Sequence, residues 1–364
     1  MRTAMMTESS TDSTMNNPAA LKVLVLAGGR SSERDVSLAT GAAVSRGLHD
    51  AGFQVLTFDP VASPRAIPWS PSSQSAAIDT DPPDRSTLVT NGSPLGTALT
   101  PQDLAMVDLK SVDLVFIALH GGDGENGRLQ ALLDLCGVRY TGSGMVASAL
   151  AMDKHAAKRI FVAERIPTPR WLVAEPGTIP PFDEVRRTLG LPVIVKPSSQ
   201  GSTVGLSLVR DETQWKEALN DAFQWDQTVL IEEFIAGREL TVGVLGDQAL
   251  PVVEIIPTHE VYDYECKYTS GRTEYICPAD LSPAQASEVQ QLGLETFRAL
   301  GCRGYARADF RMSKDGRFFC LEVNTLPGMT NLSLVPKAAR TAGIEFPELL
   351  RRICHLAMEP QGRH

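Results

Sequence analysis

The stretch FRMSKDGRFFCLEVNTLPGMT, residues 310–330, contains a turn sequence, Lys314-Asp315-Gly316, between two runs in which polar and apolar residues alternate. This pattern predicts a β-hairpin. Alternate side chains of a strand lie on the same face. The hairpin therefore brings Asp309, Glu322 and Asn324 together on one small patch.

The pairing expected from the turn is Met312 with Arg317, which places Arg307 opposite Glu322 and Asp309 opposite Cys320. Two carboxylates and a carboxamide offer the oxygen ligands that Mg²⁺ prefers. The hairpin alone leaves an alternative open, a solvent-exposed strand face whose charges Arg307 and Arg311 balance.

The length and charge of the chain limit what kind of protein it can be. Its 364 residues allow about two or three domains. Hydrophobic residues make up 43% of the sequence, which permits a large core and argues against global disorder. The net charge of −9 argues against a general nucleic-acid-binding protein, but a local anion site remains compatible with it.

The cysteines and the N-terminal residues bear on the compartment. The six cysteines form no CxxC pair, so zinc and thioredoxin-type sites lose their main support. We therefore expect reduced thiols and a cytoplasmic protein. Residues 1–20 are polar and lack the apolar segment of a signal peptide, so a flexible tail is expected. No apolar run approaches the about 20 residues that cross a bilayer, so no membrane partner is expected.

The N-terminal part has the pattern of a parallel sheet. Residues 21–27 form an apolar run, a glycine turn follows, residues 33–50 have helical spacing, and residues 53–58 predict a second strand. Strand, helix and strand in this order indicate a βαβ unit. Ser32 is expected to cap the helix, with Asp35 in the place of a capping-box glutamate.

The next segments alternate between irregular and regular patterns. Residues 60–103 are rich in Pro, Ser, Thr and Asp, which predicts a long, partly disordered surface insertion. Residues 112–119 predict another buried strand that ends at His120. Residues 145–166 are expected to form one helix that stops before Pro167.

A glycine- and serine-rich loop at residues 197–205 is a candidate phosphate site. Backbone N–H groups in such a loop bind phosphate oxygens, and Lys196 just before it would add positive charge. The alternative is an ordinary hairpin turn beside a lysine that extends to water. No GxxxxGK[ST] sequence occurs, so a P-loop NTPase is not predicted.

Several short segments, taken together and in order, resemble the motifs of the D-alanine–D-alanine ligases, a family of the ATP-grasp superfamily. They are Glu33–Ser37, His120–Gly122, Tyr140–Gly144, Met152–Lys154, Lys196–Ser198, Gly201–Gly205, Tyr262–Tyr268 and Glu322–Thr330. The resemblance covers the chain from about residue 21 to the C-terminus, apart from residues 60–103. That insertion, Gln200 and Cys266 depart from the family pattern.

The resemblance implies an α/β fold: a three-domain ATP-grasp ligase with an N-terminal parallel-sheet, Rossmann-like domain. The implied domains are residues 21–142, with 60–103 inserted, then 143–245 and 246–364, and the ATP-grasp region spans about 158–355. It also implies that ATP lies between two antiparallel sheets. The implied reaction joins two D-alanines through an acylphosphate, for peptidoglycan precursors.

The resemblance also implies roles for individual residues. Ligands of two Mg²⁺ or Mn²⁺ ions would be Asp309, Glu322 and Asn324. Contacts to ATP would come from Lys154, Lys196, Glu232, Glu233, Ile235 and Glu239. The catalytic set would be Glu33, Ser202, Ser333, Arg307, Tyr268 and Lys267, and the substrate contacts His120, Leu334 and Gly328.

Within that set, Glu33 would hold the ammonium group of the first D-alanine, and Arg307 would stabilise an oxyanion. Ser202 and Tyr268 would hydrogen bond with Glu33 to close a mobile loop. Without the family, Glu33 is a favourable charge at a helix N-terminus. His120 is likewise a buried structural histidine, Ser333 a helix cap and Glu239 a solvated glutamate.

Two other functions stay open at this point. One is a ligase that joins D-alanine to D-lactate or to another D-residue. The other is a catalytically silent nucleotide-binding regulator, which would tolerate loss of Asp309 or Glu322, yet the sequence has both. The expected partners are D-alanine, ATP and a second copy of the chain in a homodimer, without nucleic acid.

Overall fold

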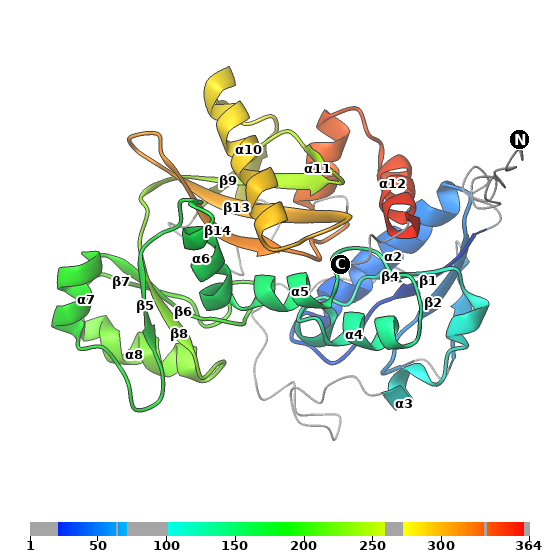
Figure 1. Cartoon of the computed structure of the whole chain (residues 1–364), viewed down its shortest axis with the longest axis horizontal. Helices are drawn as coiled ribbons and strands as arrows, with labels where there is room; N and C mark the ends of the chain where they lie inside the picture. The colour runs from blue at the N-terminus through cyan, green and yellow to red at the C-terminus, as the bar shows by residue number, and fades with distance from the viewer. Residues whose placement is uncertain (1–20, 63–64, 71–100, 259–271, 331–332, 360–364) are drawn as a thin grey trace, which may run out of the picture.

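The structure, a computed structural model, describes residues 21–62, 65–70, 101–258, 272–330 and 333–359. It contains three sheets with helices packed on them (Figure 1). The predicted tail at 1–20 and most of the predicted insertion lie outside the described residues.

The first sheet is the predicted parallel one. Strand β1 pairs in parallel with β2 and β4, and a short β3 joins β2 in the antiparallel direction. Its elements are β1 (Lys22–Leu26), α2 (Arg34–Asp50), β2 (Gln54–Phe58), β3 (Ile67–Pro68), α3 (Pro101–Leu104), η3 (Leu109–Ser111), β4 (Leu114–Ile117), η4 (Gly122–Gly124) and α4 (Arg128–Leu135).

The two faces of this sheet are covered by different helices. Val23 and Val25 belong to one apolar cluster with α2 and the C-terminal helix α12 (Phe346–Met358). Leu24 and Leu26 belong to another cluster, with α4. Helices α2 and α12 approach closely at Gly47. A Cβ added to this glycine would lie only 2.6 Å from the Leu350 side chain. The last helix of the chain therefore completes the core of the first sheet (Figure 1).

The second sheet has the strand order β5-β8-β6-β7 and is antiparallel throughout. Val193 and Val195 of β6 pack with helices α7 and α8, and the alternate residues Ile194 and Lys196 line a pocket on the other face. The elements are α5 (Met145–Met152), α6 (Lys154–Ala163), β5 (Trp171–Ala174), α7 (Phe182–Leu189), β6 (Val193–Pro197), β7 (Ser207–Val209), α8 (Glu212–Phe223) and β8 (Val229–Glu233).

The third sheet has the order β12-β11-β9-β13-β14, with β10 on β9. Phe310 and Phe318 pack against helix α10, while Arg307 and Asp309 on the opposite face line the same pocket as β6. The elements are β9 (Gly237–Leu245), β10 (Gln248–Ala249), β11 (Val253–Pro257), β12 (Thr273–Ile276), α10 (Pro283–Ala299), β13 (Tyr305–Ser313), β14 (Phe318–Asn324) and α11 (Leu334–Thr341). Strand β9 joins this sheet, so the limit predicted at residues 245/246 does not coincide with the division between the two sheets.

The hairpin of residues 305–324 forms as predicted, but its predicted register is wrong. Met312 pairs with Phe318, and the register shifts by a further residue between Asp309 and Phe310. This bulge sets Asp309 directly opposite Glu322, and Arg307 opposite Asn324. The shift brings the two carboxylates closer together than the sequence predicted.

Two helix predictions were also wrong. Residues 145–166 form two helices, because the Asp153 side chain caps α6 by accepting a hydrogen bond from the Ala156 N–H at 3.1 Å. The residue before α2 is Glu33, which makes no side-chain capping bond, so Ser32 does not cap the helix.

Candidate active site

One pocket lies between the two antiparallel sheets and is lined by all six of the predicted nucleotide-binding residues. It is lined by residues of β6, β8, β9, β13 and β14, by the loop at residues 200–204 and by the first residue of α6. The pairing of β13 with β14 places Arg307, Asp309 and Glu322 at its wall.

The acidic patch at this wall is held by hydrogen bonds and ion pairs. The Arg307 guanidinium lies 2.8 Å from Asp309 Oδ2, and the Thr241 hydroxyl donates to Asp309 Oδ1 at 2.6 Å. Asn324 follows Glu322 by two positions, and its Oδ1 accepts the Leu326 N–H at 2.8 Å. The part of the chain that the structure describes holds no group of three or more His, Cys, Asp or Glu suited to a metal. The oxygen set of two carboxylates and one amide still matches a hard divalent cation.

Lys154 connects the acidic patch to the glycine-rich loop. Its Nζ lies 3.2 Å from Glu322 Oε2 and donates to the Gln200 carbonyl at 2.6 Å. The break between α5 and α6 makes Lys154 the first residue of α6 and directs its side chain into the pocket.

A buried ion network supports the second lysine. Glu232 lies between Lys196 Nζ at 2.5 Å and Lys158 Nζ at 2.8 Å, and the Lys158 side chain is fully buried. Lys158 also donates to the Thr168 hydroxyl at 2.7 Å. Burial lowers the pKa of the Lys158 ammonium group, although the Glu232 carboxylate opposes the effect. Burial would raise the pKa of Glu232, but the two lysines overcome it and lower that pKa to about 2.

The connection from β8 to β9 forms the far end of the pocket. Glu233, Phe234, Ile235 and Glu239 line it, together with Arg311. Arg311 pairs with Glu239 at 3.0 Å. The exposed Arg170 forms an ion pair with Glu233 at 2.7 Å.

The glycine-rich loop contacts the N-terminal domain through Ser202. The Ser202 hydroxyl donates a short hydrogen bond to the Glu33 carboxylate. Ser202 and Thr203 have φ of 49° and 63°. Such backbone conformations are unfavourable for residues other than glycine and are concentrated at functional sites.

Glu33 is buried and has little space around it. A Cβ on Gly121 or on Gly201 would lie 2.9 or 3.1 Å from Glu33 Oε2, so glycine at both positions makes room for the carboxylate. The Ser31 hydroxyl accepts the Glu33 N–H at 3.2 Å and donates to the His120 carbonyl at 2.5 Å. Ser31 thereby fixes the start of α2 against the end of β4.

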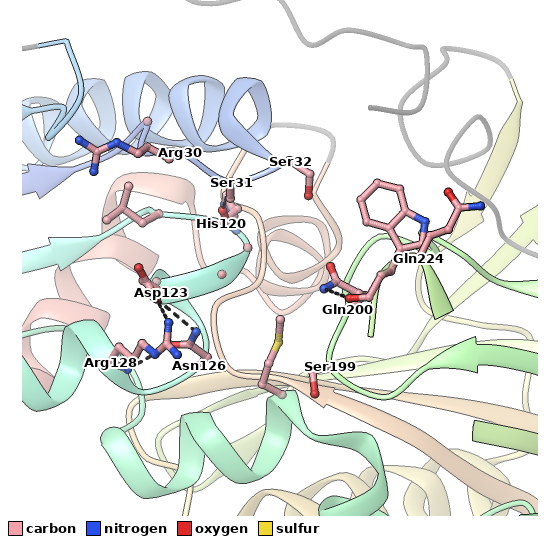
Figure 2. A pocket seen from close by; sticks show the side chains of 18 residues that line it. Arg30, Ser31, Ser32, His120, Asp123, Asn126, Arg128, Ser199, Gln200 and Gln224 are labelled. Carbon is pink, nitrogen blue, oxygen red and sulfur yellow. Dashed lines mark hydrogen bonds and ion pairs between the residues drawn. The ribbon is translucent and has the colours of Figure 1, made fainter. Parts of the chain in front are cut away.

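A second pocket lies between the N-terminal domain and the glycine-rich loop (Figure 2), and one of its lining residues, Gly121, lies against the Glu33 carboxylate. Arg30, Ser31 and Ser32 lie on one side, and Ser199 and Gln200 lie on the other. The imidazole of His120 is buried between the Thr40 hydroxyl at 2.9 Å and Glu125 at 3.4 Å.

The predicted second-substrate residues meet at the start of α11. The Ser333 hydroxyl accepts the Thr330 N–H at 3.0 Å, and Ser333 makes no capping bond to the helix. A Cβ on Gly328 would lie 2.9 Å from Ser333 Oγ. Leu334 lines the pocket between the sheets.

Comparison with known proteins identifies this arrangement. Residues 22–143 match the family model "D-ala D-ala ligase N-terminus", and residues 163–355 match "D-ala D-ala ligase C-terminus". The chain belongs to the D-alanine–D-alanine ligase family.

Individual relatives agree with this assignment. The D-alanine–D-alanine ligase of Pelotomaculum thermopropionicum is 41% identical over 351 residues, which cover 94% of this chain and 98% of that protein. The enzyme of Cupriavidus pinatubonensis is 42% identical over 91% of this chain and 90% of its own length. The crystal structure of the Bacillus anthracis ligase complexed with ATP has a TM-score of 0.72 and 31% identity, and covers 93% of this chain and 97% of that one.

The ligase fold brings most of the predicted residues to two adjoining pockets. Lys267 and Tyr268 lie outside the described residues. Sequence reasoning missed Lys158 and Thr241, and it gave Arg311 only a charge-balancing role. A signal for Arg311 existed, because Arg307, Asp309 and Arg311 alternate along one strand and share its pocket face.

Proposed function

We propose that this chain joins two D-alanines into D-alanyl-D-alanine and converts ATP to ADP and phosphate. The main support is the pocket between the two antiparallel sheets, where Asp309 and Glu322 oppose each other beside Lys154 and Arg307. The match of both family models to the chain supports the same reaction.

In the proposed first step, a carboxylate oxygen of the first D-alanine attacks the γ-phosphorus of ATP, and ADP leaves. The amine of the second D-alanine then attacks the carbonyl carbon of the acylphosphate. Before this attack, the ammonium group of the second D-alanine gives up one proton to solvent and becomes an amine. After the attack, phosphate departs and the nitrogen gives up a second proton, which leaves the amide of the dipeptide. Arg307 donates to the oxyanion of the tetrahedral intermediate.

The substrate-binding groups are assigned from the family resemblance. Glu33 binds the ammonium group of the first D-alanine, and His120 is a second contact to this substrate. Ser333, Leu334 and Gly328 receive the carboxylate of the second. Lys154 and Lys196 contact the phosphates, and the 232–239 stretch, with Glu232, Glu233, Ile235 and Glu239, holds the nucleoside. The family resemblance assigns Lys267 to the transferred phosphate, and Tyr268 keeps the role given above, a hydrogen bond with Ser202 and Glu33.

The acidic patch fits divalent cations. Asp309, Glu322 and Asn324 would hold two Mg²⁺ or Mn²⁺ ions, because Asp309 and Glu322 face each other on two paired strands and Asn324 follows Glu322 by two positions. Bound cations of this kind offset phosphate charge. Asp309 is kept in place for this role by the Thr241 hydroxyl.

The test measures phosphate and dipeptide released from ATP and Mg²⁺ with D-alanine, L-alanine, and D-lactate as a competing acceptor. We expect turnover with D-alanine and none with L-alanine or after chelation of the metal. Equal turnover with L-alanine, or no D-alanyl-D-alanine, would contradict the proposal.

We also propose a homodimer that acts in the cytoplasm. Exposed apolar side chains on neighbouring helices support the dimer: Leu135 on α4, Val146 on α5 and Val162 on α6. No helix among the described ranges is long and apolar enough to cross a membrane. Light scattering at several protein concentrations measures the assembly, and a monomeric mass throughout would rule out the dimer.

A further inference from the structure

The segment that joins the two antiparallel sheets is also part of the pocket wall. Strand β8 ends at Glu233 and β9 begins at Gly237, so three residues make the connection. Two of them, Phe234 and Ile235, line the pocket. The directions of the backbone N–H and C=O groups at this wall therefore depend on whatever holds the connection in place.

Arg311 holds both ends of this connection. Its Nε donates to the Ile235 carbonyl at 3.0 Å, and its Nη2 donates to the Gly237 carbonyl at 3.0 Å. Its Nη1 donates to Glu239 Oε2 at 3.0 Å, and its guanidinium carbon lies 5.4 Å from the centre of the Phe234 ring. One planar group thus contacts Phe234, Ile235, Gly237 and Glu239.

The backbone around Gly237 adds a second restraint. Gly237 has φ of 150°, and a Cβ there would lie 2.0 Å from the Met312 carbonyl oxygen. The connection is therefore pressed against β13 directly beside Arg311. Arg311 itself is buried, with 9% of its surface exposed.

We propose that Arg311 is a positioning residue that fixes the 234–237 connection and the Glu239 carboxylate against the nucleoside part of the bound nucleotide. It thereby sets the affinity for the nucleotide and the preference for adenine over guanine. The inference deepens the proposed function and rests on the pocket being the nucleotide site. A purely structural role for Arg311 is the alternative.

The three bonds require the geometry of arginine. A guanidinium presents its donors in a rigid plane, so it can bind two carbonyls and a carboxylate at once. A lysine at this position would keep the positive charge opposite Glu239, but it could not make the same three directed hydrogen bonds. Arg311→Lys therefore separates charge from geometry, and Arg311→Met removes both.

The experiment measures equilibrium binding of ATP and GTP by calorimetry, without D-alanine, for the wild-type chain, Arg311→Lys and Arg311→Met. Steady-state KM values for ATP and D-alanine and the melting temperature are measured alongside. We expect both variants to bind ATP about tenfold or more weakly, since charge-assisted hydrogen bonds are lost. The ATP-to-GTP affinity ratio falls in both, and the KM for D-alanine stays within about twofold.

Arg238→Lys is the matched control. Arg238 pairs with Glu254 at 2.6 Å in the same sheet, but neither residue lines the nucleotide pocket. The control is expected to change the melting temperature without changing the affinity ratio.

The inference is overturned if Arg311→Lys keeps the wild-type ATP affinity and ATP-to-GTP ratio, whether or not its melting temperature falls. It is equally overturned if the wild-type chain binds ATP and GTP alike. A chain that binds ATP selectively but forms no dipeptide would refute the proposed function alone. The binding comparison would then still decide the role of Arg311.

Discussion

The two ends of the pocket between the sheets handle charge in opposite ways. At the end with the acidic patch, Lys154 pairs with Glu322 at 3.2 Å and Arg307 with Asp309 at 2.8 Å. Each of these groups is also assigned to a substrate or a cation. At the other end, Lys158, Glu232 and Lys196 form a network in which Lys158 is fully buried.

This difference indicates two kinds of ion pair. The pairs at the acidic patch join groups that are also assigned to phosphates or cations. When those ligands bind, each group exchanges its partner, so these ion pairs are temporary. Around Glu232, the pair with Lys158 is fully buried and holds the shape of the sheet edge, whereas Glu232 and Lys196 are also assigned to the nucleotide. Substitutions at the first end should mainly change turnover, and substitution of Lys158 should mainly change stability.

The largest expected effect tests the acidic patch. Glu322→Gln should lower turnover by more than about a hundredfold, because even a group that only supports a metal ligand is worth about 10- to 100-fold. The melting temperature should change little, since the face is polar. The matched control is Asp315→Asn in the exposed turn of the same hairpin, which should retain full phosphate release. Near-normal turnover in Glu322→Gln would contradict the distinction between the two ends of the pocket.

The next effect tests the buried network. Lys158→Met should lower the free energy of unfolding by about 3–5 kcal/mol, because it leaves the Glu232 carboxylate with one fewer buried partner. Arg170→Met, which removes an exposed pair with Glu233, should cost no more than about 1 kcal/mol. Chemical denaturation measures both. Equal losses in the two variants would mean that burial does not distinguish the pairs.

The pH dependence sharpens the same point. The pKa of Glu232 is about 2 in the folded chain, below its ordinary value of 4.5. A lowered carboxyl pKa stabilises the fold above the ordinary value, and this contribution, roughly 3 kcal/mol at neutral pH, is lost as pH falls from about 4.5 towards about 2. The variant Glu232→Gln has no ionisable carboxyl group at this position, so it lacks this contribution to stability. The stability gap between wild type and variant should therefore shrink between pH 5 and pH 3, and a constant gap would contradict the lowered pKa.

The smallest effect concerns the contact between Ser202 and Glu33. Ser202→Ala removes one hydrogen bond, worth roughly 1 kcal/mol, so unfolding should change little. If the pair positions Glu33 for the first D-alanine, the KM for that substrate should rise several-fold while ATP affinity is kept. Ser199→Ala, in the same loop, serves as the control. An unchanged KM in Ser202→Ala would limit the pair to a structural contact between domains.

Local patterns in the sequence predicted much of the fold and the placement of a few site residues, whereas the roles of most site residues came from the family resemblance and stay predictions. The run at Lys22–Leu26, the glycine-rich loop and the shared face of Asp309 and Glu322 follow from alternation and turn residues, which act over a few positions. The break at Asp153 also had a local signal, since aspartate is a common cap, but the continuous apolar spacing around it concealed the break.

Other features depended on distant parts of the chain. The register of β13 and β14 is set by a bulge, and β13 also pairs along its length with β9. Lys158 and Arg311 acquire their roles from Glu232 and Ile235, which are far away in sequence. Strand β9 likewise joins strands that come later in the chain, so the two antiparallel sheets divide between β8 and β9.

The packing of α12 on the first sheet has a consequence for how the chain is made. Residues 22–26 leave the ribosome early, but the apolar face that Val23 and Val25 help to form is closed by Leu349, Leu350 and Ile353. The N-terminal domain therefore cannot finish its core during translation, and it has to wait until the final helix has been released. A chain truncated before residue 346 would expose this face, and it would present chaperones and proteases with a permanently incomplete domain.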